Sequence, residues 1–245
     1  MLRSLIHFWR INVAVILGAA VATSVLTGAL LVGDSVQGSL QRLTLGRLGK
    51  VDQAILSTRF VREQLGVEIG GTAEVERAAP ILSLRASIQN ASTGTRVNNV
   101  ALYGVDERFG AFFDGSPVED QTNRLRVIHP NEALSKTLGV GVGDAVVLSL
   151  EVPSSINREF LFGHDDASER TIRRRVRVGD SAGDDEGARF SFDPQQTIPL
   201  VAYVNLDAIQ RLLELDGRAN AFLLDTDADV ADTGKLLAEK IELED

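Results

Sequence analysis

The sequence contains no cysteine, and this absence excludes disulfide bonds, thiolate catalysis and cysteine-bound zinc. Positive charge is also scarce, because 25 Lys and Arg residues stand against 34 Asp and Glu residues. The formal net charge is therefore −9. Nucleic acids and anionic lipid surfaces both bind to basic faces, so this charge balance argues against both as partners.

The sequence also lacks a phosphate-binding loop. Lys50 and Lys235 each follow a glycine, but Val51 and Leu236 stand where a Walker A loop needs Ser or Thr. Any ATP hydrolysis must therefore reside in another chain. The glycine-rich segment 139–144 follows a predicted helix and precedes a predicted strand, which reverses the order found in dinucleotide-binding loops. It predicts a tight turn with left-handed glycines.

Histidine is rare, and its positions argue against hydrolytic or metal chemistry. Gly33-Asp34-Ser35 resembles the nucleophile block of one lipase and esterase family, but none of the three histidines lies in the late Asp-x-x-His context that supplies the base. His164-Asp165-Asp166 has no second ligand cluster at metal spacing, which favours a solvated turn. We therefore expect no catalytic residue, no metal site and no cofactor. The histidines are His7, His129 and His164.

A long charge-free segment dominates the start of the chain. Residues 11–33 carry no charge and lie between Arg3 and Arg10 on one side and Asp34 on the other. As a helix, these residues span about 34 Å, which is enough to cross a bilayer core of about 30 Å. The segment therefore predicts a transmembrane helix over 11–33, with residues 1–10 as a cytoplasmic N-terminus.

A cleaved secretory signal is the alternative for this segment. Arg3 and Arg10 would form its basic region, and Ala20-Val21-Ala22 would suit a signal peptidase. However, the apolar run continues to Val32, well past a signal core of about 7–15 residues. A retained anchor is therefore favoured. The positive-inside bias then places the rest of the chain outside the bacterial inner membrane.

Helical spacing continues beyond the charge-free segment. Apolar residues recur at helical intervals with polar residues between them, which predicts an amphipathic stalk helix over 34–50. Within the span, Ala14, Gly18 and Ala22 recur every four residues, and small residues at this spacing let a second membrane helix approach closely. The apolar stalk positions are Val36, Leu40, Leu43 and Leu48.

Mixed helix and strand patterns fill the remainder, 51–245, and we expect an α+β fold. Alternation over 82–88 and 96–105 around a turn-rich 90–95 predicts a hairpin. Two lobes are expected, 51–105 with 198–245, and 106–197. The predicted strands cover 52–57, 82–88, 96–105, 145–152, 171–178, 198–204 and 219–225, and the predicted helices cover 59–65, 72–78, 130–138, 206–215 and 230–241.

Arginine is concentrated in the predicted strand 171–178. Arg173, Arg175 and Arg177 point one way, and Arg174 points the other way with two valines. Such a run is compatible with a site for phosphate or lipid headgroups. Because acidic residues follow at 180–186, a salt-bridged surface is the favoured interpretation.

Four blocks, the first of which includes the predicted membrane helix, occur in a distinctive order. They are 11–40 with 47–52, then 100–106 (Val-Ala-Leu-Tyr-Gly-Val-Asp), 131–144 with Leu138-Gly139-Val140 and Gly143-Asp144, and 201–224. In this order and spacing, the chain resembles the N-terminal half of a MacB/FtsX-like ABC transporter permease, the group that includes lipoprotein-releasing permeases. The resemblance implies a MacB-type periplasmic core domain after the stalk.

The resemblance also implies a function without catalysis in this chain. Permeases of this family pair with a second permease chain, identical or different, and with a cytoplasmic ATP-binding subunit, and they are surrounded by membrane lipid. ATP-driven closure is passed through the membrane helices and the stalk to the periplasmic domain, for export or for lipoprotein or lipid release. Three further membrane helices follow in the family, so we expect this chain to be an N-terminal fragment. A self-sufficient, single-span binding or envelope-assembly protein is the alternative.

Overall fold

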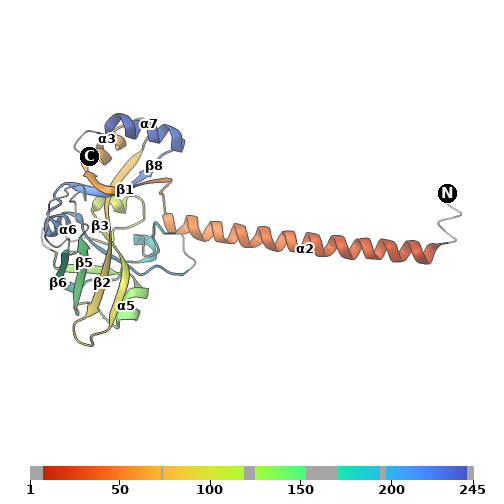
Figure 1. Ribbon diagram of the computed structural model, residues 1–245, viewed down its shortest axis with the longest axis horizontal. Coiled ribbons are helices and arrows are strands. Elements are labelled where there is room, and N and C mark those ends of the chain that lie inside the picture. Colours follow the sequence, from red (N-terminus) through yellow and green to blue (C-terminus); the bar gives the residue numbers. More distant parts are fainter. Residues whose placement is uncertain (1–7, 73, 119–124, 153–169, 194–196, 242–245) are drawn as a thin grey trace, which may run out of the picture. The chain divides into compact units, whose positions relative to one another are not determined.

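The computed structural model describes residues 8–72, 74–118, 125–152, 170–193 and 197–241, with only the backbone described at 40–46, 152 and 170. The chain divides into two compact units, Met1–Gly46 and Arg47–Asp245. The first unit contains most of helix α2, and the second contains all of the strands (Figure 1). His7 and the motif His164-Asp165-Asp166 lie outside the described residues.

Helix α2 runs without interruption from Trp9 to Leu48. Its 40 residues correspond to a length of about 60 Å. The segment contains no proline, so no backbone hydrogen bond of the helix is lost. The helix ends at Gly49, whose φ of 60° places it in the left-handed region that commonly terminates helices. A single helix thus includes the predicted membrane span and nearly all of the predicted stalk.

The second unit is built on an eight-stranded mixed sheet with the order β1-β8-β2-β3-β7-β4-β6-β5. Strand β5 also pairs with β2, so six of these strands close into a ring, β2-β3-β7-β4-β6-β5. Pairs β3–β7 and β4–β6 are parallel, and the others are antiparallel. The strands are β1 (Gln53–Arg62), β2 (Arg77–Asn90), β3 (Arg96–Val105), β4 (Val127–Pro130), β5 (Ala145–Val152), β6 (Arg170–Val178), β7 (Val201–Asn205) and β8 (Arg218–Asp225).

Short helices join and cover these strands. Two of them begin directly after an asparagine N-cap: Asn131 accepts a hydrogen bond from the Leu134 amide, and Asn205 accepts one from the Ala208 amide. The predicted fold class, an apolar N-terminal helix followed by a mixed α/β domain, is confirmed. The helices are α3 (Gln64–Gly70), α4 (Glu107–Gly110), α5 (Glu132–Leu138), the 3-10 helix η1 (Asp184–Glu186), α6 (Leu206–Leu213) and α7 (Val230–Lys240).

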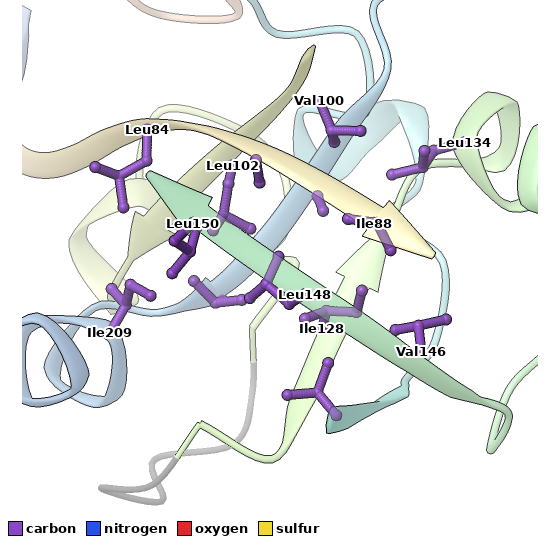
Figure 2. Close-up of a cluster of buried hydrophobic side chains, with 14 of the residues drawn as sticks. Leu84, Ile88, Val100, Leu102, Ile128, Leu134, Val146, Leu148, Leu150 and Ile209 are labelled. Carbon is purple, nitrogen blue, oxygen red and sulfur yellow. The ribbon is translucent and has the colours of Figure 1, made fainter. Parts of the chain in front are cut away.

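The interior of the six-stranded ring is the largest hydrophobic core. Alternate residues of β2 and β5 point into it, and Figure 2 shows their side chains meeting those of β3 and β4. Leu148 and Ile88 are completely buried there. Helices α5 and α6 add Leu134 and Ile209 to the same cluster. The ring is therefore filled by side chains from elements that are distant in the sequence.

Two further clusters pack on other faces of the sheets. One is rich in aromatic rings, with Tyr203 contacting Tyr103 at 5.9 Å and Phe109 at 5.5 Å between ring centroids. The hydroxyl of Tyr203 donates to the Gly187 carbonyl at 2.6 Å, so this buried phenol is satisfied. The other cluster packs α3 and α7 against the β1-β8-β2 sheet through Leu65, Ile69, Phe222 and Leu237.

The predicted hairpin is confirmed, with β2 and β3 pairing around the turn at 91–95. The pairing contains a bulge, because one residue of β2, Ser87, lies opposite the two residues Asn98 and Asn99 of β3. Asn99 adopts a φ of 56°, which asparagine tolerates better than most residues. The turn predicted at 139–144 is confirmed as well, with Gly139 at φ 62° and Gly143 at φ 90°.

Two predicted helices are wrong. The helix expected over 59–65 begins only at Gln64, because β1 continues to Arg62 along β8. The helix expected over 72–78 does not form, since β2 starts at Arg77 and runs through Pro80. Pro80 fits in a strand because β2 pairs only with β8 there, and pairing with β3 starts at Leu82.

The start of a third predicted helix needs correction. The helix expected over 130–138 begins at Glu132, and Pro130 is the last residue of β4. Pro130 is itself a buried strand position, and its fixed φ of about −65° is as acceptable at a strand end as in the first turn of a helix. Pro130 therefore could not indicate whether its position ends a strand or begins a helix.

Candidate functional site

Helix α2 is the most prominent functional feature of the chain. Residues Trp9–Ser39 are long and apolar enough to cross a membrane, with a mean hydropathy of 2.3 in the most apolar window. Large apolar side chains on every side of this segment are exposed, for example Ile16 and Leu26 at 65% each. A helix that is apolar all round requires an apolar environment, which a lipid bilayer provides.

The three small residues predicted to mediate helix packing lie along one stripe of α2. Ala14, Gly18 and Ala22 are exposed, and apart from the adjoining backbone of the helix itself no described atom lies within 4 Å of a Cβ placed on Gly18. Nearby Thr23 is satisfied within the helix, since its hydroxyl donates to the Ala19 carbonyl. The stripe is therefore open to a second helix, and its role in packing stays a prediction.

The stalk residues differ in their surroundings. Val36 is exposed, whereas Leu48 is half-buried and packs against the aromatic cluster of the second unit. The side chains of Leu40 and Leu43 lie outside the described part of the structure. Their role in the stalk, like that of Val36 and Leu48, stays a prediction.

Residues after Leu48 hold the helix end inside the second unit. The Lys50 amide donates to the Phe112 carbonyl at 2.9 Å, and Val51 packs against the aromatic cluster. Gly49 leaves no room for a side chain, because a Cβ there would lie 2.5 Å from the Phe112 carbonyl oxygen. The left-handed conformation and this close approach both require glycine at position 49.

The described residues show no arrangement typical of an active site. No group of three or more His, Asp or Glu side chains among them could hold a metal ion. The buried hydroxyls belong to the core: burial raises the pKa of Tyr103 and raises that of Tyr203 well above the usual value of 10.0. A buried, neutral tyrosine that donates to a backbone carbonyl stabilises the fold and is not activated as a base.

The salt-bridged surface predicted for the arginine strand is wrong. Strand β6 forms as expected, and Val176 and Val178 are buried, but Arg173, Arg175 and Arg177 make no ion pair with any carboxylate of the described residues. The acidic segment pairs elsewhere, with Asp184 2.8 Å from Arg189. The Glu186 carboxylate accepts from the Gly183 amide. Sequence proximity did not imply contact, because 179–183 leads the acids away from the strand.

This chain is similar to known proteins in its structure but not in its sequence. No protein-family model and no curated protein matches the sequence. The structure is similar to the periplasmic region of MacB from Actinobacillus actinomycetemcomitans, with 10% identity and a TM-score of 0.45, over 80% of this chain and 84% of that one.

A second similar structure is the extracellular domain of the noncanonic ABC-type transporter YknZ from Gram-positive bacteria. The identity is 9% and the TM-score is 0.46, over 76% of this chain and 89% of that one.

Proposed function

We propose that this chain is the N-terminal part of the membrane subunit of an ABC transporter, and that it couples ATP hydrolysis in a partner to movement of an extracytoplasmic domain. The order of the sequence blocks behind one membrane helix supports this proposal. So does the absence of any phosphate-binding loop or hydrolytic constellation in the sequence, since such a subunit needs neither.

The single observation that carries the proposal is the continuity of α2. The helix runs unbroken from the apolar span to Leu48, and its last residues, from Arg47 on, belong to the second unit. An α-helix without proline or a break behaves as a stiff rod, so a displacement at one end reaches the other. Residues 34–50 would act as the lever between membrane and domain.

The proposed partners follow from the same layout. A cytoplasmic ATP-binding subunit supplies the chemistry, and a second permease chain packs against Ala14, Gly18 and Ala22 within membrane lipid. Arg3 and Arg10 keep the N-terminus in the cytoplasm of a bacterial cell, with the α/β domain outside the inner membrane. The transported molecule is exported or, for a lipoprotein or lipid, released from the membrane.

Co-purification tests this function directly. The complete reading frame is expressed with any ATPase subunit encoded beside it, purified through a tag on this chain and assayed for ATP hydrolysis in lipid. We expect a stoichiometric complex whose ATPase rate depends on the membrane subunit. A chain that purifies alone and leaves the ATPase rate unchanged contradicts the proposal.

A single-span binding or envelope-assembly protein is a second candidate. The observation that favours it is the exposed face of β6, where Arg173, Arg175 and Arg177 make no ion pair with a carboxylate of the described residues. Such a face suits a protein that captures a partner. The same purification distinguishes the two functions, because an anchored binding protein has no associated ATPase.

A further inference from the structure

The outer face of the ring carries an arrangement of arginines that the transporter proposal does not use. Arg175 of β6 lies opposite Val147 of β5, Val147 lies opposite Gln89 of β2, and Gln89 lies opposite Arg96 of β3. Directly opposite residues in antiparallel strands share a face. This row therefore crosses four strands on one side of the sheet, with an arginine at each end.

Arg173 and Arg177 extend the row along β6. Alternate residues of a strand lie on the same face about 6.6 Å apart, so the three arginines form a line. Arg96 is separated from them by uncharged residues of β2 and β5, which are Ser87, Gln89, Val147 and Ser149. We call Arg96, Arg173, Arg175 and Arg177 the arginine face.

The arginine face is exposed and carries excess positive charge. All four side chains are exposed, and no carboxylate of the described residues lies within ion-pair distance of any of them. Glu151 is the one acidic residue on this face of β5. Neighbouring Arg85 is paired with Asp193 and does not add to the excess. The chain as a whole has a net charge of −9, so this surface is a local patch of the opposite, positive charge.

The bulge in β3 helps to fix the position of Arg96 on the arginine face. It directs Asn98 toward Ser87, whose hydroxyl donates to the Asn98 side-chain oxygen at 2.7 Å. The Ser87 oxygen accepts from Arg96 Nε at 2.6 Å. Arg96 is thus held in place by a neutral partner that leaves its charge unopposed.

The spacing of the arginines favours an extended acidic chain over a compact anion. About three strand spacings, or about 14 Å, separate Arg96 from Arg175, which is too far for one phosphate group to contact both. The arginines along β6 instead repeat with the period of alternate side chains in an extended peptide. Guanidinium groups bind carboxylates in a planar, bidentate manner, so each could pair with one acidic side chain.

We propose that the arginine face binds an extended, acidic segment of a partner protein, with Asp or Glu at alternate positions. The partner runs along β6, over Arg173, Arg175 and Arg177, and it contacts side chains of the sheet because both edges of β6 are already paired with β4 and β5. This interaction goes beyond the transporter function and does not depend on it.

A binding experiment with model peptides tests the proposal on the full chain in nanodiscs of zwitterionic lipid. The probe is a fluorescent 12-residue peptide of alternating Glu and Thr, which presents its carboxylates on one face when extended. A peptide of the same composition in the order Glu-Glu-Thr-Thr lacks that alignment. Anisotropy at low ionic strength should show binding of the first peptide at least about threefold tighter than of the second.

Variants locate the binding to the face. The triple variant R173S/R175S/R177S should weaken binding of the alternating peptide at least about tenfold, since three charge-assisted contacts are lost. Arg174 is the nearest control, because it lies on β6 but on the opposite face, and R174S should change binding less than twofold. The distant variant R59S/K235S/K240S removes the same charge and should also have less than a twofold effect.

Inositol hexakisphosphate serves as a compact polyphosphate probe. The proposal is overturned if this probe binds in a manner sensitive to the triple variant while the alternating peptide does not, which would assign the face to phosphate groups. Equal losses in the triple and distant variants, or no peptide binding at low salt, also overturn it. Near-UV circular dichroism of each variant confirms that the fold is retained.

Discussion

Substitution of Gly49 by alanine should destabilise the second unit far more than a glycine substitution ordinarily does. Gly49 combines a φ of 60° with a close contact, because a Cβ there would lie 2.5 Å from the Phe112 carbonyl oxygen and 2.9 Å from the Phe113 ring. The left-handed conformation costs an alanine about 1 kcal/mol. Displacing the Phe112 backbone adds about 2 kcal/mol, so the expected total is about 3 kcal/mol.

Gly139 provides a matched control. It caps helix α5 at nearly the same φ, 62°, but nothing lies within 4 Å of a Cβ placed there. Gly139→Ala should therefore cost only the conformational term of about 1 kcal/mol. The difference between the two variants isolates the close approach at the end of α2.

Urea unfolding of the full chain in detergent measures this difference. The only tryptophan, Trp9, lies in α2, so the near-UV signal of Tyr103 and Tyr203 is the suitable probe of the second unit. With an m-value of about 2 kcal/mol/M, the midpoint for Gly49→Ala should lie about 1 M below that for Gly139→Ala. Equal midpoints would refute the conclusion that the helix end is tightly held there.

Three further predictions follow. Leu148→Ala should lower the free energy of unfolding by about 3 kcal/mol, because Leu148 is fully buried in the ring, whereas the exposed Leu56→Ala should change it by under about 0.5 kcal/mol. Burial raises the pKa of Tyr203 above its unfolded value, so its stabilising contribution is complete below about pH 10 and is lost as the pH rises through the folded pKa. Thermal melts between pH 8 and 11 should show a steeper loss in the wild type than in Tyr203→Phe. Gly18→Leu should reduce crosslinking between two copies of α2 in membranes, whereas Ala20→Leu, at an exposed small residue on the opposite face of the helix, should not.

Local signals made part of the fold predictable. A long charge-free segment without proline favours a helix, and the Asn205 side chain marks the start of α6 that the structure shows. The alternating residues of β2 and β3 likewise predicted their hairpin. In these regions the local preference and the tertiary environment agree.

Long-range pairing decided the regions that sequence patterns misplaced. Nothing local distinguishes 59–62 as strand, and the residues adopt it because β8, more than 150 positions later, offers a pairing partner. Pro80 suggested a helix end, yet it occupies a strand position where only one edge is paired. Closure of the ring by β2 and β5 is likewise invisible in the sequence.

The arginine face illustrates the limit of net charge as a guide. A net charge of −9 argues against basic surfaces, but it is a sum over the chain and says nothing about position. The acids of 180–186 seemed close enough to neutralise the strand, and only the structure shows that Asp184 pairs with Arg189 instead. The sequence predicted the strand and its alternation but not its unpaired charges.

Topology labelling tests the central claim, a retained membrane helix with the domain outside, most directly. Because the chain has no cysteine, single substitutions report one site each: Ser92→Cys in the turn between β2 and β3, and Ser4→Cys before the helix. We expect a membrane-impermeant maleimide to label Cys at 92 but not at 4 in intact spheroplasts, and the chain to stay in the pellet after carbonate extraction. Labelling of position 92 only after lysis, or a soluble product that begins near Thr23, would contradict the account.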